Sequence, residues 1–342
     1  MKSHTVSHKL LEQFAYYDRI TKCFRLWRYE KSRTPYPKAS PRTATRIDGH
    51  FAHPEDAAKE EELETRLAAE FEECVNQFLS RLDDPSFVPT DLQRRQLTFY
   101  VTLLFNRSEA RRAASKHLHD VTIHAVEKFI SNEVQVLTVA AKWSIDLLLG
   151  GKVRNALVTK QHVVHAAMGL LENYQTERKR QQSYVEMIER AMLKLDEALF
   201  DGRWDCRRTS PDNPFVISDA PVVTWERLGT GLFSYGLGFH RPNVEIFLPL
   251  SPMTCLHILP NVKRTRSVLQ PTVQEINIAQ AAFASHYCFT NINSAEINSA
   301  LQPNFGRAKL GVTAFTIWHR NYDNPVYELL MNDGKWVEPP LK

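Results

Sequence analysis

Hydrophobic periodicity divides this sequence into three regions, and the division limits the folds that are open to it. Residues 24–29 (FRLWRY) alternate with a period of two, which is typical of a β-strand. From about residue 55 to residue 200 apolar residues recur at helical spacing instead, and after Trp204 short β-like runs return between Pro and Gly residues. Strand patterns on both sides of a long helical stretch predict that strands from the two ends of the chain meet in one sheet.

We therefore expect an α+β fold with a small mixed or antiparallel sheet, formed by the N-terminal and C-terminal strands and interrupted by a long, bundle-like helical insertion. The pattern places the boundaries at residues 1–53 for the N-terminal strands, 54–202 for the helical region and 203–342 for the C-terminal α+β region. A length of 342 residues suits one large domain or two of ordinary size. Such a chain can bury a core without disulfides or metal ions.

Local signals place the helices. An apolar stripe over residues 60–82 predicts an amphipathic helix. Capping boxes predict helix starts at Thr90, three residues before Gln93, and at Thr272, three residues before Glu275. Further helices are expected over 119–149, over 159–200 and from Asn293 onward.

Strand signals are short and lie at both ends of the chain. A loop is expected over residues 35–41, which are rich in Pro, and a strand over 47–51 is expected to pair with 24–29. The C-terminal strands are expected at 215–217, 222–223, 244–248, 255–259 and 312–318.

Composition argues against several kinds of site. Glycine is scarce, with 12 residues, and no Gly-rich phosphate loop of the P-loop or dinucleotide type is present. The pairs His117-x-His119 and His162-x-x-His165 lack the spacing and the acidic companion of a zinc site. The cysteines are odd in number and far apart, which is typical of reduced thiols. They are Cys23, Cys74, Cys206, Cys255 and Cys288.

The charge balance permits a nucleic-acid or nucleotide partner without arguing for one. The chain has 43 Lys and Arg against 39 Asp and Glu, a formal net charge of +4, and most charges are interspersed. Two basic clusters stand out, at residues 178–180 and 263–266. Each is either a solvated face or a patch that binds phosphates.

The sequence predicts a cytoplasmic protein with no membrane partner. Its first residues, MKSHTVSHKLLEQF, contain no apolar run that could serve as a signal-peptide core. The most apolar stretch, residues 134–149, is interrupted by Lys142 and Asp146, which are costly at the centre of a bilayer.

Two candidate site residues come from the first half of the chain. His4 precedes the first amphipathic turn and is either a general acid or base or a solvent-exposed terminal histidine. Arg107 follows the apolar stripe of Tyr100 and Leu104 at helical spacing. Its guanidinium can hold a phosphate or carboxylate in a pocket, or lay its stem on the core and reach solvent.

Three further candidates come from the C-terminal region. Ser218 and Asp219 end a predicted buried strand just before a proline-directed turn. Asp219 can orient a histidine, bind a metal ion or act as a base, or it can cap the backbone of an Asx-turn. Asn277 lies in an otherwise apolar helix, so an inward-facing amide needs either backbone or ligand partners.

Taken in chain order, these motifs resemble a known family. They are an opening box from His4 to Ala15, the aromatic strand 26–29, a middle helix ending in Arg107, Phe200-x-x-x-Trp204, the box 215–222 (FVISDAPV), Pro249-Leu250-Ser251-Pro252, and an Asn-bearing helix that leads into an aromatic strand, 277–289. The chain resembles the uncharacterised family called domain of unknown function 4238. The likeness covers residues 4 to about 290, and the joint order of the boxes, more than any single box, carries it.

The resemblance implies no settled activity, but it marks six motif positions. Ser7 stands where the family usually has Pro, and the Pro that usually follows the middle Arg is missing. A family glutamate in the acidic helix matches either Glu70 or Glu64. The motif positions are His4, Arg107, Trp204, Ser218, Asp219 and Asn277.

We weigh three functions. The first is a hydrolase acting on a phosphodiester or nucleotide, with His4 as general acid or base, Asp219 orienting it or holding a divalent ion, and Arg107 stabilising phosphate charge. Trp204, Ser218 and Asn277 would then line the binding site, although no ligand motif supports a metal ion at Asp219. The second is a non-catalytic binding or regulatory module, in host defence or on mobile elements, whose motifs are fold signatures. The third is a nucleic-acid-binding protein that uses the two basic clusters.

Overall fold

The computed structural model describes most of the chain, which divides into two compact units. One unit is Met1–Ala113 with Tyr184–Gly311, and the other is Ala114–Ser183 with Val312–Lys342. These units cut across the three regions expected from the pattern, since residues 57–113 of the helical region belong with the sheets. All six motif positions lie in the first unit. The residues described are 2–51, 57–84, 86–113, 116, 123, 127–128, 130–133, 136–137, 140, 159–174, 176–227, 233–235, 239, 243–260 and 270–308.

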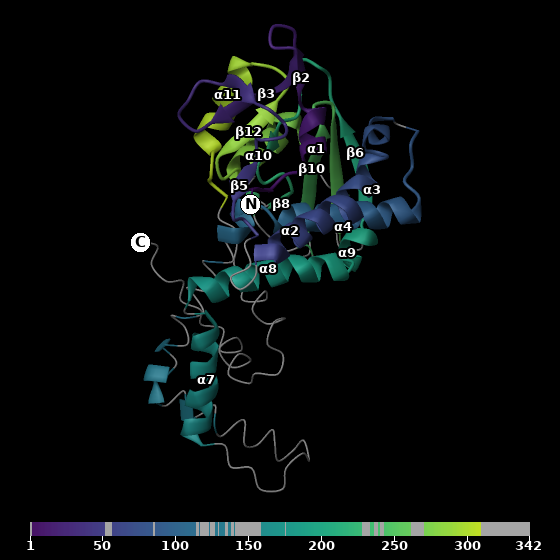
Figure 1. The fold of residues 1–342 in the computed structure, drawn as a ribbon. Coiled ribbons are helices and arrows are strands. Elements are labelled where there is room, and N and C mark those ends of the chain that lie inside the picture. The colour runs from purple at the N-terminus through teal and green to yellow at the C-terminus, as the bar shows by residue number, and fades with distance from the viewer. Residues whose placement is uncertain are drawn as a thin grey trace. The chain divides into compact units, whose positions relative to one another are not determined.

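The described chain is built from short strands at both ends and helices in between (Figure 1). The strands are β1 (Lys2–His4), β2 (Tyr16–Asp18), β3 (Cys23–Glu30), β4 (Tyr36–Ala39), β5 (Arg46–Asp48), β6 (Arg203–Arg208), β7 (Ile217–Ser218), β8 (Val223–Arg227), β9 (Phe233–Tyr235), β10 (Glu245–Ser251), β11 (Thr254–Leu259) and β12 (Tyr287–Thr290). The helices are α1 (His8–Gln13), α2 (Ala57–Arg66), α3 (Glu73–Asn76), α4 (Asp91–Asn106), α7 (Lys160–Tyr174), α8 (Glu177–Leu193), α9 (Glu197–Phe200), α10 (Val273–Phe283) and α11 (Ala295–Leu301).

Strands from the two ends of the chain share one antiparallel sheet. Its order is β2-β3-β12-β7, with β4 also paired to β3. Tyr29 of β3 lies opposite Cys288 of β12, which in turn lies opposite Ser218 of β7. In Figure 1 the purple N-terminal strand β3 lies beside the yellow-green β12. The fold is α+β, as the periodicity predicts.

The sheet structure is larger than the single small sheet expected. A second antiparallel sheet has the order β6-β11-β10-β8-β9, and β1 and β5 form a two-stranded sheet. The strand expected over residues 47–51 therefore pairs with β1 and not with 24–29, because β3 is already paired with β2, β4 and β12. The predicted loop over 35–41 contains β4, with Tyr36 opposite Arg28.

The helices follow their capping signals more closely than their apolar stripes. The capping boxes at Thr90 and Thr272 are both formed. The helix expected over 60–82 is divided by a π-helical turn at Leu67–Glu72 and ends in a 3-10 turn, Leu79–Asp83. The single helix expected over 159–200 is three helices, α7, α8 and α9. The last helix begins at Ala295 rather than at Asn293, because Ser294 caps it by accepting from Ile297 N.

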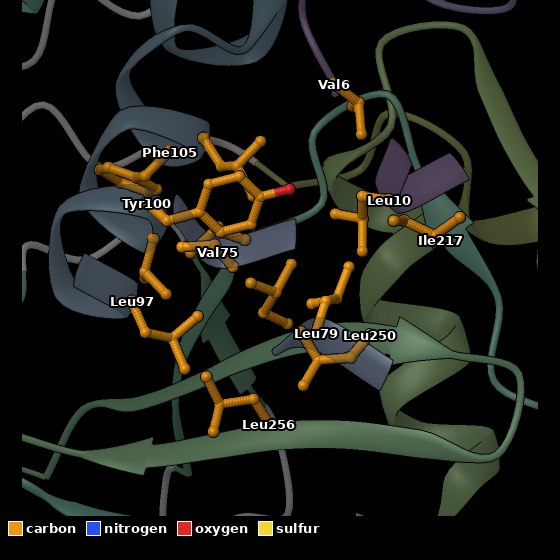
Figure 2. Packing of buried hydrophobic residues seen from close by; sticks show 14 of the residues in the cluster. Val6, Leu10, Val75, Leu79, Leu97, Tyr100, Phe105, Ile217, Leu250 and Leu256 are labelled. Carbon is orange, nitrogen blue, oxygen red and sulfur yellow. The ribbon is translucent and has the colours of Figure 1, made fainter. Parts of the chain in front are cut away.

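The N-terminal box forms part of the main core. Val6, Leu10 and Phe14 are fully buried in one cluster with Tyr100 of α4 and Ile246 of β10. Figure 2 shows Val6, Leu10 and Tyr100 directed into this interior. A second cluster covers the other face of β10, since Phe247 packs with Ala279 of α10. Both faces of β10 are therefore covered, which explains why every residue of this strand is buried.

Several expectations fall on residues that are not described. The strand at 312–318, the basic cluster 263–266 and the pair His117 and His119 lie outside the described part of the chain, as do the side chains of Arg178 and Lys179. Most of the apolar stretch 134–149 also lies outside it. In the part that is described, no helix is long and apolar enough to cross a membrane.

Candidate functional site

His4 ends β1 and stands among groups from three segments. Its backbone N–H donates to Glu64 Oε1 over 3.0 Å. Its ring nitrogen Nε2 lies 3.0 Å from the carbonyl oxygen of Arg42 and 3.1 Å from Nε of Arg46. When Nε2 is protonated it can donate to the carbonyl, and when it is unprotonated it can accept from Arg46. Nε2 of His4 thus has a hydrogen-bond partner whether or not it carries a hydrogen.

Arg107 is the hub of a buried polar cluster beside His4. Its side chain is 2% exposed, and its Nε donates to the carbonyl oxygen of Thr5 over 3.0 Å. Its Nη1 makes an ion pair with Glu72 Oε1 at 2.5 Å. The backbone that carries His4 is thereby fixed to the C-terminal end of α4, because Thr5 follows His4 directly.

Burial and neighbouring charges give the groups of this cluster different proton affinities. Burial raises the pKa of Glu64, and the nearby Glu72 carboxylate raises it further. The Arg107 guanidinium and the His4 N–H act to lower this pKa, but the net shift is upward. Burial acts to lower the pKa of Arg107, but Glu72, Tyr100 and Glu64 outweigh it, so the net shift is upward and Arg107 stays charged. A carboxyl group with a raised pKa, such as Glu64, is the kind of group that enzymes use as a general acid.

Three buried polar atoms of the cluster have no hydrogen-bond partner among the described residues: Ser7 Oγ, the Tyr100 hydroxyl and Arg107 Nη2. The Ser7 and Tyr100 hydroxyls face one another without the geometry of a hydrogen bond. Burial raises the pKa of Tyr100, so its hydroxyl keeps its proton. Buried polar groups without partners are uncommon, and they mark places where a water molecule or a ligand completes the hydrogen bonding.

The outer side of the cluster is cationic. Arg42 and Arg46 are exposed, and within the described part of the chain neither has an acidic partner. The rings of His4 and His8 lie 6.3 Å apart, centroid to centroid. An exposed guanidinium that donates to a histidine ring and has no acidic partner, as at Arg46, favours a phosphate or another anion at this surface.

The structure adds His50, which the sequence pattern gives no reason to select. His50 is fully buried, with Nε2 2.6 Å from the carbonyl oxygen of Arg107 and 2.9 Å from the hydroxyl of Tyr184. Its Nδ1 lies 3.4 Å from Glu109 Oε2, and this contact is the main cause that lowers the pKa of Glu109. His50 therefore contacts the backbone of Arg107, whereas Thr5 binds its side chain, and His50 lies outside every motif box.

Asp219 has partners of its own. Its carboxylate accepts the N–H of Ser285 over 2.8 Å and those of His286 and Tyr287 over 2.7 and 3.1 Å. Burial raises its pKa to about 6, against these three donors, which act to lower it. Asp219 joins the end of β7 to the segment between α10 and β12. Within the described residues no hydrogen bond or ion pair joins it to His4 or Arg107.

Asn277 bonds to backbone groups beside β7, and Ser218 bonds to Gln280 of α10. Asn277 Oδ1 accepts from Val216 N and its Nδ2 donates to Pro214 O, both over 2.9 Å. One turn on, Gln280 Oε1 accepts from the backbone N–H of Ser218 over 3.0 Å and lies 2.8 Å from its hydroxyl. The inward amide of Asn277 thus takes the backbone partners that were one of its two expected roles.

Trp204 holds α4 against the second sheet. Its indole Nε1 donates to Leu199 O over 2.8 Å, and the Arg94 guanidinium lies 4.9 Å from its ring centroid. Arg94 Nε also donates to the carbonyl oxygen of Phe200 over 2.7 Å, and Arg94 bonds to that of Gly202. The Phe200-x-x-x-Trp204 box therefore binds Arg94 of α4 through a backbone carbonyl group and two aromatic rings.

We expect Gly202→Ala to destabilise the protein by about 1 to 3 kcal/mol, because the added methyl group meets backbone that cannot move aside. A Cβ at this position would lie 2.9 Å from Leu259 O and 3.1 Å from Ala198 O. Gly169→Ala in α7 is the matched control, since nothing lies within 4 Å of its Cβ position. Chemical denaturation measures both, and equal stability of the two variants would contradict the argument.

A metal centre finds no support in the described residues. Nowhere among them do three His, Cys, Asp or Glu side chains come together in a group that could hold a metal ion. Both oxygens of Asp219 already accept N–H groups, so a divalent ion there would displace them.

The family model described as "Protein of unknown function (DUF4238)" matches residues 2–294. The chain belongs to this family. Comparison with curated proteins and comparison with solved structures both give no match.

Two positions of the family pattern can be compared with the structure: the glutamate of the acidic helix and the proline of the opening box. Of the two glutamates that could match the family position, Glu64 bonds to His4, whereas Glu70 is about half exposed and pairs with Arg66. Ser7, which stands where the family usually has Pro, has a φ of −52°, within the range that proline imposes.

Proposed function

We propose that the protein is a hydrolase acting on a phosphodiester or nucleotide, with its centre at His4, Glu64 and Arg107. The observation that carries this proposal is the meeting of these three residues from β1, α2 and the end of α4 around one buried cluster. Arg107 is a positioning residue, because its guanidinium holds the Thr5 carbonyl and Glu72. His4 and Glu64 are the groups that exchange protons.

The chemistry needs one proton acceptor and one proton donor. Unprotonated Nε2 of His4, once Arg46 Nε has turned from it toward the phosphate, takes a proton from the attacking water, whose oxygen forms the new bond to phosphorus. Protonated Glu64, with its raised pKa, gives its proton to the oxygen that leaves as the old phosphorus–oxygen bond breaks. The exposed side chains of Arg42 and Arg46 receive the phosphate charge. Transfer of the proton from His4 to Glu64 through solvent then restores the starting state.

The test is a hydrolysis screen with phosphodiester and nucleotide substrates. We expect His4→Gln and Glu64→Gln each to reduce activity by about 100-fold, the scale of one acid or base. Glu64 must be protonated, so wild-type activity falls as pH rises through its pKa, and Glu64→Gln removes this alkaline limb. Glu70→Gln is the matched control on the following helical turn.

Two results would overturn the proposal. One is wild-type protein without activity on any of these substrates. The other is full activity in both variants at unchanged thermal stability.

The second candidate is a non-catalytic binding or regulatory module. The contacts of Asp219, Asn277 and Trp204 favour it, since these motif residues bond to backbone and fasten elements together. Under this candidate His4→Gln and Glu64→Gln lower the melting temperature and alter no catalytic rate. The same two variants therefore separate the candidates.

A further inference from the structure

An exposed apolar patch lies at the turn between β2 and β3, and nothing in the hydrolase proposal uses it. Tyr17 is 54% exposed, Phe24 is 57% exposed and Ile20, in the turn, is 92% exposed. Figure 1 shows this purple hairpin at the edge of its sheet, with its turn standing clear of neighbouring elements. Large side chains held this far into solvent at one place mark an interaction surface.

The aromatic rings of the patch are preorganised for binding by their places in the hairpin. Tyr17 and Phe24 lie opposite each other across β2 and β3, with ring centroids 5.5 Å apart in an edge-to-face pair. On the other side of the ribbon Tyr16 stacks on Trp27, with ring centroids 6.1 Å apart. The exposed pair can thus offer ring surface to a planar partner at little conformational cost.

The charges of the turn favour an anionic partner. Arg19 and Lys22 are exposed, and neither has an acidic partner within the described residues. The acid of the turn is occupied, because Asp18 accepts from Ile20 N and from the Thr21 hydroxyl and pairs with Arg25 at 3.1 Å. Two free cations therefore flank the apolar and aromatic side chains.

We propose that the β2–β3 hairpin binds single-stranded nucleic acid, with bases stacked on Tyr17 and Phe24 and phosphates held by Arg19 and Lys22. Aromatic rings beside cations match a strand whose π-faces and charges alternate along its length. Ile20 extends the apolar surface at the turn. This surface is separate from His4 and Glu64, so binding does not require hydrolysis.

The experiment measures anisotropy of a short fluorescein-labelled oligothymidylate with the full chain, in wild type and in Glu64→Gln, in which the proposed hydrolysis of the probe is about 100-fold slower. We expect Tyr17→Leu and Phe24→Leu each to weaken binding by at least about fivefold, because leucine keeps the apolar surface but loses the ring. Arg19→Gln with Lys22→Gln should reduce the slope of log affinity against log salt by about 1.4, or about 0.7 for each lost cation.

Two variants elsewhere in the same unit serve as controls, and phosphatidylserine vesicles serve as the alternative partner. Leu92→Ala and Arg33→Gln remove an exposed apolar group and an exposed cation elsewhere, and both should bind like wild type. Binding of wild type to phosphatidylserine vesicles but not to the oligonucleotide would overturn the proposal in favour of a lipid surface. Hairpin variants that bind the oligonucleotide as wild type does would overturn it as well. Loss of hydrolysis with retained binding would overturn the hydrolase alone.

Discussion

Asp219→Ala should lower the free energy of unfolding by about 3 to 5 kcal/mol, since it leaves three partly buried donors without their acceptor. The donors are the N–H groups of Ser285, His286 and Tyr287, all within 3.1 Å of the carboxylate. These three residues connect α10 to β12, the strand that joins the two ends of the chain. Chemical denaturation at neutral pH measures the loss, and Asp212→Ala, at an exposed position nearby, is the control.

The pH dependence gives the same prediction a second readout. The folded-state pKa of Asp219 is about 6, above the ordinary value of 3.8, so its ionisation costs more in the folded state than in the unfolded state. The part of its contribution that depends on the bound proton is therefore complete below the ordinary value and is lost as pH rises through about 6, whereas the three N–H hydrogen bonds to the carboxylate remain at neutral pH. A separation of about two pH units corresponds to about 3 kcal/mol. Asp219→Asn should lack this loss, and a parallel pH profile for the two proteins would contradict the assignment.

Arg107→Met should be as damaging, at about 3 to 5 kcal/mol, because removing one partner of a buried ion pair leaves the other charge uncompensated. The carboxylate left behind is Glu72, and the carbonyl oxygen of Thr5 loses its donor as well. Methionine keeps much of the volume of the arginine stem, so the effect comes mainly from the charge and the hydrogen bonds.

A double variant separates lost charge pairing from lost packing. Arg107→Met with Glu72→Gln removes both charges and should recover part of the stability that Arg107→Met loses. Arg95→Met, at an exposed position of the same helix, is the control and should cost well under 1 kcal/mol. Urea denaturation measures wild type, Arg107→Met, Glu72→Gln, the double variant and Arg95→Met. A double variant that is less stable than the sum of the single losses would contradict the ion-pair explanation.

The candidate site was predictable in part. His4 and Arg107 follow from motif positions in the sequence, and the structure connects them through Glu64 and the Thr5 carbonyl. Glu72 and His50 carry no signal of their own, because one acidic residue on a charged helix resembles the next and a buried histidine has no characteristic spacing. Asp219 shows the opposite case, since a carboxylate at a strand end fits a catalytic role and a backbone cap equally well until its donors are known.

Local signals determined the elements, and long-range pairing determined the fold. The sequence by itself defined the aromatic strand β3, the capping boxes at Thr90 and Thr272 and the α+β class, because turn chemistry and periodicity act over a few residues. Only the tertiary structure decided that β5 pairs with β1 and that the helical region is divided between two units. Those choices depend on which strand edges and apolar faces remain free once other segments have packed, and no short stretch of sequence contains that information.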